Sequence, residues 1–230
     1  MQLRMKRRIG ILLVVIIFLI SSFLSYVYLN DRPGGFSDQR MSKLLGMDET
    51  VHIPTGKTPE MAIQKFRSEQ YTSQFIHEEP VEGGMIVFTQ RASTESSNLQ
   101  IEYVRKRIFG WKWGWGGGYG ISKSPSNPPA LDYMSMPRLE HIESPFPIIF
   151  GNVLNPAIKR ITVETKGSGK QISTKAKMVE VGAERNIWFV LLPSSASTPF
   201  EIKAFNEEGV RIAIKEINDP NDSGSLLIED

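Results

Sequence analysis

Cysteine is absent from the chain, and this absence excludes several structures and chemistries at once. Without cysteine the protein has no disulfide, no thiolate metal site, no cysteine nucleophile and no lipid-modified cysteine of the bacterial lipoprotein type. Any membrane attachment must therefore come from the peptide itself.

An excess of charge of one sign is also missing, since the 230 residues carry a formal net charge of only +2. Part of this small excess lies in the N-terminal cluster of Arg4, Lys6, Arg7 and Arg8. The remainder lacks the strongly basic surface of a nucleic-acid-binding protein, so nucleic acid is not an expected partner. Hydrophobic residues make up 40% and charged residues 23%, which is close to the globular average and enough to form a core.

Motifs for catalysis and metal binding are scarce as well. His52, His77 and His141 lie far apart, without the short spacing of zinc ligands, so the sequence predicts no metal and no cofactor. The chain has no Gly-x-Ser-x-Gly motif, and the glycine-rich stretch 110–120 lacks the Gly-Lys-Ser/Thr ending of a phosphate-binding loop. We therefore predict a non-enzymatic protein; an enzyme with a site assembled from scattered residues is the alternative.

What the sequence does contain is one long apolar run near its start. Residues 9–29 carry no charge, and at about 1.5 Å per residue a helix of this length spans a hydrocarbon core of about 30 Å. The basic cluster precedes the run, whereas Asn30 and Asp31 follow it. The positive-inside bias then predicts a cytoplasmic N-terminus and an extracytoplasmic remainder, with Tyr26 and Tyr28 at the lipid–water interface.

A cleaved signal peptide is the alternative for this run, because a basic start and an apolar stretch are common to both. Cleavage requires small residues at alternate positions near the site. The small residues Ser21, Ser22 and Ser25 are followed by the bulky residues 26–28, and the run is longer than a usual signal core. An uncleaved single-pass anchor in the cell membrane is the preferred interpretation.

Two folded parts are predicted after the anchor. Thr58, Pro59 and Glu60 supply an N-cap, a first-turn proline and a first-turn carboxylate, which predict a helix from about Pro59 to Gln70. Alternating apolar residues then predict strands at 73–79, 85–91 and 99–108. A Ser/Pro-rich stretch follows, and short strands recur at 146–150, 158–165, 171–181, 186–192, 200–205 and 210–217.

The fold class expected is therefore α+β: a transmembrane helix, a small helix-plus-antiparallel-sheet domain and an immunoglobulin-like β-sandwich. The predicted boundaries are a cytoplasmic start 1–8, a transmembrane helix 9–29, a linker 30–57, an α+β domain 58–121, a linker 122–138, a sandwich 139–217 and a disordered tail 218–230. The strand at 186–192 is apolar on both faces, so it needs a second cover from a loop, the linker or the first domain.

Several local patterns resemble small membrane-anchored or secreted envelope proteins of Bacillus and related spore-forming bacteria. The patterns are Thr58-Pro59-Glu60, Gly83-Gly84, the aromatic-glycine segment 109–118, Phe150-Gly151, Asn155-Pro156, 158–161 and 187–189. The resemblance implies an envelope location. It implies no catalytic or binding residue.

The most distinctive segment contains Trp111, Trp113 and Trp115, which project on one face if the segment is a strand. The preferred interpretation is that these rings cover the single helix of the first domain as core. Alternatively, with Tyr119, they form an exposed strip that binds sugar rings or a partner, or that contacts the bilayer surface. The glycines between them decide none of these.

The predicted function is that of a membrane-anchored extracytoplasmic protein that binds a protein partner or acts in an envelope assembly. The alternative is a cell-wall or carbohydrate binding module that uses Trp111, Trp113 and Trp115. The expected partners are the membrane, through residues 9–29, and a protein or a cell-wall polymer.

Overall fold

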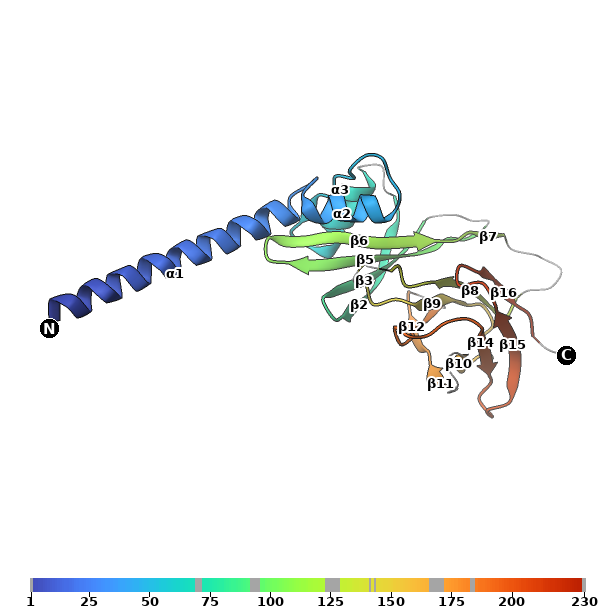
Figure 1. The fold of residues 1–230 in the computed structure, drawn as a ribbon. Coiled ribbons are helices and arrows are strands. Elements are labelled where there is room, and N and C mark those ends of the chain that lie inside the picture. Colours follow the sequence, from blue (N-terminus) through green and yellow to red (C-terminus); the bar gives the residue numbers. More distant parts are fainter. Residues whose placement is uncertain are drawn as a thin grey trace. The chain divides into compact units, whose positions relative to one another are not determined.

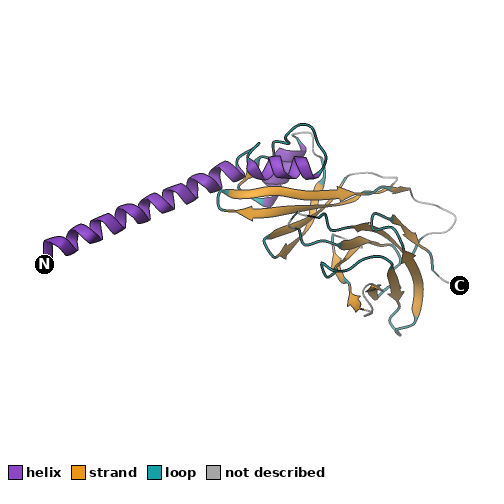
Figure 2. Cartoon of the chain, in the orientation of Figure 1, coloured by secondary structure: helices purple, strands orange, loops and turns teal. Residues whose placement is uncertain are grey.

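The computed structural model describes residues 2–68, 72–91, 96–122, 129–140, 142, 144–165, 172–182 and 185–228. Within these ranges the helices all precede Ser68 and every later element is a strand (Figures 1 and 2). The strand pairs are antiparallel. The α+β prediction with antiparallel sheets is confirmed.

Helix α1 (Gln2–Asp31) has 30 residues and is long and apolar enough to cross a membrane. Its apolar side chains face away from the rest of the protein: Ile17 is 65% exposed and Phe18 is 68% exposed. A core helix of a soluble protein would have such side chains covered. The helix therefore offers its apolar surface to an environment outside the protein.

The segment after α1 is folded, which corrects the prediction of a linker at 30–57. It forms helix α2 (Phe36–Leu44) and the short strand β1 (Thr55–Gly56), and it buries Asp38 and Ile53. The prolines and glycines that suggest a linker instead make tight turns. At Gly35 a Cβ atom would lie 2.4 Å from the carbonyl oxygen of Leu29, so the turn requires glycine.

Helix α3 (Pro59–Arg67) begins where the sequence predicts. The Thr58 hydroxyl accepts a hydrogen bond from the Met61 backbone N–H at 3.2 Å, and Pro59 occupies the first turn. Ala62 and Ile63 form its buried face.

The first sheet has the strand order β1-β6-β5-β3-β2. Its longer strands are β2 (Gln74–Val81), β3 (Gly84–Gln90), β5 (Leu99–Arg107) and β6 (Gly110–Gly118). The short strands β4 (Ser96–Ser97) and β7 (Ile121–Ser122) pair separately. A turn at Gly83 joins β2 and β3, and its φ of +75° is one that glycine adopts without strain.

Two further sheets follow. One has the order β12-β13-β9-β8-β16 and the other the order β11-β10-β14-β15. Their strands are β8 (Leu131–Met136), β9 (Ile148–Val153), β10 (Arg160–Thr165), β11 (Ile172–Lys175), β12 (Lys177–Glu180), β13 (Asn186–Leu191), β14 (Phe200–Phe205), β15 (Arg211–Ile217) and β16 (Ser223–Leu226). The single strand expected at 171–181 is two strands that change sheet at the buried Ala176.

The sheet that contains β13 has an apolar core on each face. Trp188 and Val190 pack with side chains of the β11-β10-β14-β15 sheet, such as Ile202. Ile187 and Phe189 belong to a second cluster with Ile86, Phe88 and other side chains of the first sheet. The second cover that the sequence requires for 186–192 is thus the sheet of the first predicted domain. The side chains of β13 that pack with the β11-β10-β14-β15 sheet are the set that contains Trp188.

Two strands lie in segments expected to be unstructured. The predicted linker 122–138 contains β8, whose Leu131 and Tyr133 face one core while Met134 and Met136 face the other. The predicted disordered tail 218–230 contains β16, which pairs with β8 and buries Leu226. Both predictions need correction for one reason: proline- and serine-rich neighbours obscure a short alternating strand.

The boundaries of the two compact units differ from those of the predicted domains. One unit comprises Met1–Glu69 and Arg105–Trp113, and the other Gln70–Val104 and Gly114–Asp230. Strands β5 and β6 contribute residues to both units. The second and third sheets, together with β2 and β3, lie in the second unit.

Candidate functional site

The central tryptophan of β6 is a packing residue. Trp113 is 6% exposed, and its ring stacks on Phe66 of α3 with centroids 4.0 Å apart and planes 16° from parallel. The guanidinium carbon of Arg67 lies 5.3 Å from the same ring. A sugar would have to displace Phe66 to reach this face, because stacking on a ligand requires a free ring face.

The other residues of the predicted strip have different neighbours. Trp111 is half-buried, lies opposite Gly56 of β1 and has the Lys106 ammonium 5.8 Å from its ring centroid. Trp115 packs against the core between the first sheet and the β13 sheet. Tyr119 is buried and donates its hydroxyl hydrogen to Asp132. The structure therefore does not gather the four residues into one exposed surface.

The glycines of β6 are explained by the neighbouring strand. A Cβ on Gly116 would lie 2.1 Å from the Glu102 Oε2 atom, and one on Gly118 would lie 2.3 Å from the Gln100 side chain. Glycine at these alternate positions gives space to long polar side chains of β5.

A buried polar cluster surrounds Asp132 in the second unit. The carboxylate accepts hydrogen bonds from Tyr119 and from the Asn152 side-chain amide, the latter at 3.0 Å to Oδ2. The backbone oxygen of Asp132 accepts from the Trp188 indole N–H at 3.0 Å. Burial, and then the Asp132 charge, raises the pKa of Tyr119, so the phenol stays a donor. These groups satisfy one another and have a structural role.

A second buried polar cluster lies at the end of α1 in the first unit. The Lys112 ammonium is 2.7 Å from the Asp38 Oδ1 atom, and both side chains are buried. The ammonium also donates to the backbone oxygens of Asp31 at 2.8 Å and Arg32 at 3.4 Å. A cation thus lies at the negative end of the α1 helix dipole, where it is favourable.

Asp38 also binds two backbone segments of the same unit. Its Oδ2 atom accepts the backbone N–H of Gly34 at 2.9 Å and that of Ile53 at 3.0 Å. The Arg107 Nε atom lies 3.9 Å from the Asp31 Oδ1 atom, which adds a weaker ionic contact. Burial lowers the pKa of Lys112, and the hydrogen bond and charge of Asp38 oppose that shift. The cluster is a clamp that joins the last turn of α1 to α2 and β6.

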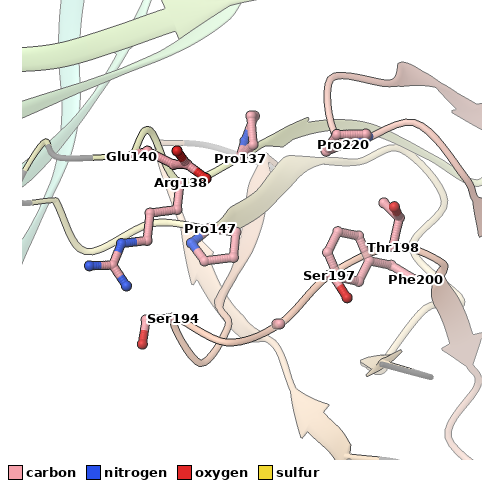
Figure 3. Close-up of a pocket in the computed structure, with 10 residues that line it drawn as sticks. Pro137, Arg138, Glu140, Pro147, Ser194, Ser197, Thr198, Phe200 and Pro220 are labelled. Atoms are coloured by element: carbon pink, nitrogen blue, oxygen red, sulfur yellow. The ribbon is translucent and has the colours of Figure 1, made fainter. Parts of the chain in front are cut away.

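An open pocket lies in the second unit and has a volume of about 620 Å³. The residues that line it are Pro137, Arg138, Glu140, Pro147, Ser194, Ala196, Ser197, Thr198, Phe200 and Pro220. Figure 3 shows Arg138 and Glu140 toward one side and Thr198 and Pro220 toward the other. Its described walls combine proline rings, hydroxyl groups and one charge of each sign.

Sequence reasoning missed the residues of the clamp and of the pocket. Lys112 gives a recognisable signal, since it is one charged side chain between two tryptophans in a strand. Arg138 and Glu140 give none, because two exposed charges near prolines are typical of any loop.

His52 and His77 each have other neighbours in their own unit. The ring of His77 lies 3.2 Å from the Glu79 carboxylate, His52 is near Gly34, and His141 lies outside the described residues. Among the residues that the structure describes, no three His, Asp or Glu side chains are close enough to hold a metal ion.

The chain matches no protein-family model, no curated protein and no solved structure. Evidence for its function therefore comes from its own geometry.

Proposed function

We propose that the chain is an uncleaved single-pass membrane protein with a cytoplasmic N-terminus and an extracytoplasmic β-rich part. The observation that carries this proposal is the clamp at the end of α1. Asp31 is 4% exposed and its carbonyl oxygen is held by Lys112, so the last turn of the apolar helix is part of the folded unit. Cleavage inside 21–29 would separate this turn from its helix. The basic residues before the run set the orientation.

The anchor and its orientation are tested with cysteines, which the natural chain lacks. Gln2→Cys and Val210→Cys variants are treated on intact cells with a membrane-impermeant maleimide. Val210→Cys should label on intact cells and Gln2→Cys only after permeabilisation. Loss of the Gln2→Cys label from the mature protein would show cleavage, and the reverse labelling pattern would show the opposite orientation.

For the fold, we propose the immunoglobulin-like class, and the strand order supports it. In that class strands A, B, E and D form one sheet and C, F and G the other. Here β8, β9, β13 and β12 stand in the places of A, B, E and D, and β10, β14 and β15 stand in the places of C, F and G. Strand β11 extends the second sheet beside β10, and β16 is an addition beside β8.

The part outside the membrane, in this proposal, binds an extended segment of a protein partner in an envelope assembly. Its pocket supports this role. Proline rings and the buried Phe200 offer apolar packing, the hydroxyls of Ser197 and Thr198 suit a peptide backbone, and Arg138 and Glu140 suit charged side chains.

The partner is tested by photo-crosslinking in cells. A photoreactive phenylalanine replaces Ser197, which is exposed at the pocket. The control position is Glu207, which is exposed in the turn at the other end of β14, about 20 Å along the strand.

A protein partner should give an adduct of discrete mass at Ser197 that is lost with Arg138→Ala and absent at Glu207. An adduct that disappears after muramidase digestion would assign the pocket to cell-wall polymer, the alternative function. Equal adducts at both positions would overturn a pocket-specific partner.

A further inference from the structure

The turn between β5 and β6 exposes two large apolar side chains at its tip. Ile108 is 60% exposed and Phe109 is 49% exposed. In a soluble protein an exposed apolar hairpin tip is unfavourable and signals an interaction surface. Three basic residues, Arg105, Lys106 and Arg107, immediately precede the tip.

This tip lies beside α1 within the first unit. The rings of Phe109 and Tyr28 are in edge contact with centroids 6.1 Å apart. Phe109 also borders a hollow of about 480 Å³ whose other walls come from α1. Those wall residues are Ser21, Leu24, Ser25, Tyr28 and Leu29.

The position along α1 sets the depth of the tip. The charge-free run ends at Leu29, and Ser25 lies one helical turn, or about 6 Å, inside that end. Because a hydrocarbon core of about 30 Å needs almost the whole run, the hollow lies at the level of the lipid and its interface. If α1 spans the membrane, the Phe109 side chain that borders this hollow therefore does not lie in bulk water.

We propose that Ile108 and Phe109 insert into the outer lipid–water interface beside α1, so that the membrane holds the first unit at two points. This inference rests on the proposed membrane anchor. Acyl chains fill the hollow between the tip and the helix, whose walls include Leu24 and Leu29. The clamp of Lys112 and Asp38 fixes the hairpin relative to α1, so the tip has one depth.

The test uses the full chain in vesicles of phosphatidylethanolamine and phosphatidylglycerol in equal parts. Single cysteines carry an environment-sensitive fluorophore at one of three positions. Ile108→Cys reports the tip and leaves the Phe109–Tyr28 contact in place; Leu24→Cys reports the anchor. Val210→Cys is the matched control, because its side chain is 58% exposed, almost as much as that of Ile108.

The expected result is that lipid-borne spin labels quench the fluorophore at positions 24 and 108, and that aqueous iodide quenches it at position 210. Quenching at 108 by iodide but not by lipid, with position 24 in lipid, would overturn the tip insertion and leave the anchor intact. Iodide quenching at position 24 would overturn the anchor itself. Protection at 108 from both quenchers would assign the tip to a protein contact, such as a second copy, instead of lipid.

Discussion

Lys112 and Asp38 form a buried ion pair 2.7 Å long across 74 residues of sequence, with side chains 0% and 1% exposed. Water cannot replace either partner at that depth. Lys112 also binds the carbonyl oxygen of Asp31, in the last turn of α1. It therefore fixes the helix that contains the apolar run to β6, the strand that follows the hairpin tip. The proposed anchor and the proposed interfacial contact both depend on it.

Replacing Lys112 with methionine should destabilise the first unit by about 3–5 kcal/mol, because it leaves a buried carboxylate without its cation. Hydrogen–deuterium exchange of the full chain in detergent should show faster exchange at the Gly34 and Ile53 amides, which donate to Asp38. The double variant Lys112→Met with Asp38→Asn should recover part of the loss, since the buried carboxylate that lost its cation is then also removed. Unchanged exchange in the single variant would show that the pair does not hold this unit.

The stack of Trp113 on Phe66 gives a second prediction. Trp113→Ala and Phe66→Ala should each destabilise the protein, and the double variant should lose less than their sum by about 0.5–1.5 kcal/mol. Trp111→Ala is the matched control, because Trp111 is a tryptophan of the same strand that is only half-buried. Denaturant unfolding measures the cycle. Additive losses would mean that the two rings do not interact in solution.

Trp188 is fully buried in the core that it shares with Ile202, and its indole N–H donates to the Asp132 carbonyl at 3.0 Å. Truncating it to alanine should cost about 3–5 kcal/mol in the free energy of unfolding, as for other buried aromatic residues. Trp188→Phe should cost less, because it retains most of the apolar packing and loses the hydrogen bond. If both variants keep the wild-type unfolding midpoint, the ring is not in the core.

The sequence predicts the bounds of an element best where the residues of that element alone decide them. The strand 200–205 has the predicted bounds, and the α3 start follows from Thr58 and Pro59 alone. β8 is different, because it includes Asp132, a residue that reads as surface. Its burial depends on donors from Tyr119 and Asn152, which only the tertiary fold brings to it.

The candidate sites were predictable to a smaller extent for the same reason. The sequence indicates that Trp111, Trp113 and Trp115 are distinctive, but local spacing cannot say which of them another element covers. The clamp requires α2 and β6 to meet, and the pocket requires the β8–β9 and β13–β14 connections to meet. Lys112 between two tryptophans is a local signal of the clamp, but it does not indicate α2 as the partner, and Arg138 and Glu140 give no local signal of the pocket.

The final prediction concerns Tyr133, whose hydroxyl donates to the Asp222 Oδ2 atom at 2.7 Å and so fixes the start of the β16 segment to β8. Burial, and then the hydrogen bond to Asp222, raises the pKa of this phenol above its ordinary value. In the unfolded chain a tyrosine loses its proton near pH 10, whereas in the folded chain Tyr133 retains it to higher pH. The unfolded state therefore binds fewer protons above about pH 10, and the free energy of unfolding must fall as the pH rises through this range.

Tyr133→Phe isolates this contribution. At neutral pH the variant should be less stable by about 1 kcal/mol, the usual value of one hydrogen bond. Above about pH 10 its stability should fall less steeply than that of the wild type, because phenylalanine has no proton to lose. Tyr119, whose pKa is also raised, and Lys112, whose pKa is lowered and whose effect has the opposite sign, are present in both proteins, so the difference between the two pH profiles reports Tyr133 alone. Denaturant unfolding across the alkaline range measures the profiles, and parallel curves would show that the Tyr133–Asp222 hydrogen bond does not control this part of the pH dependence.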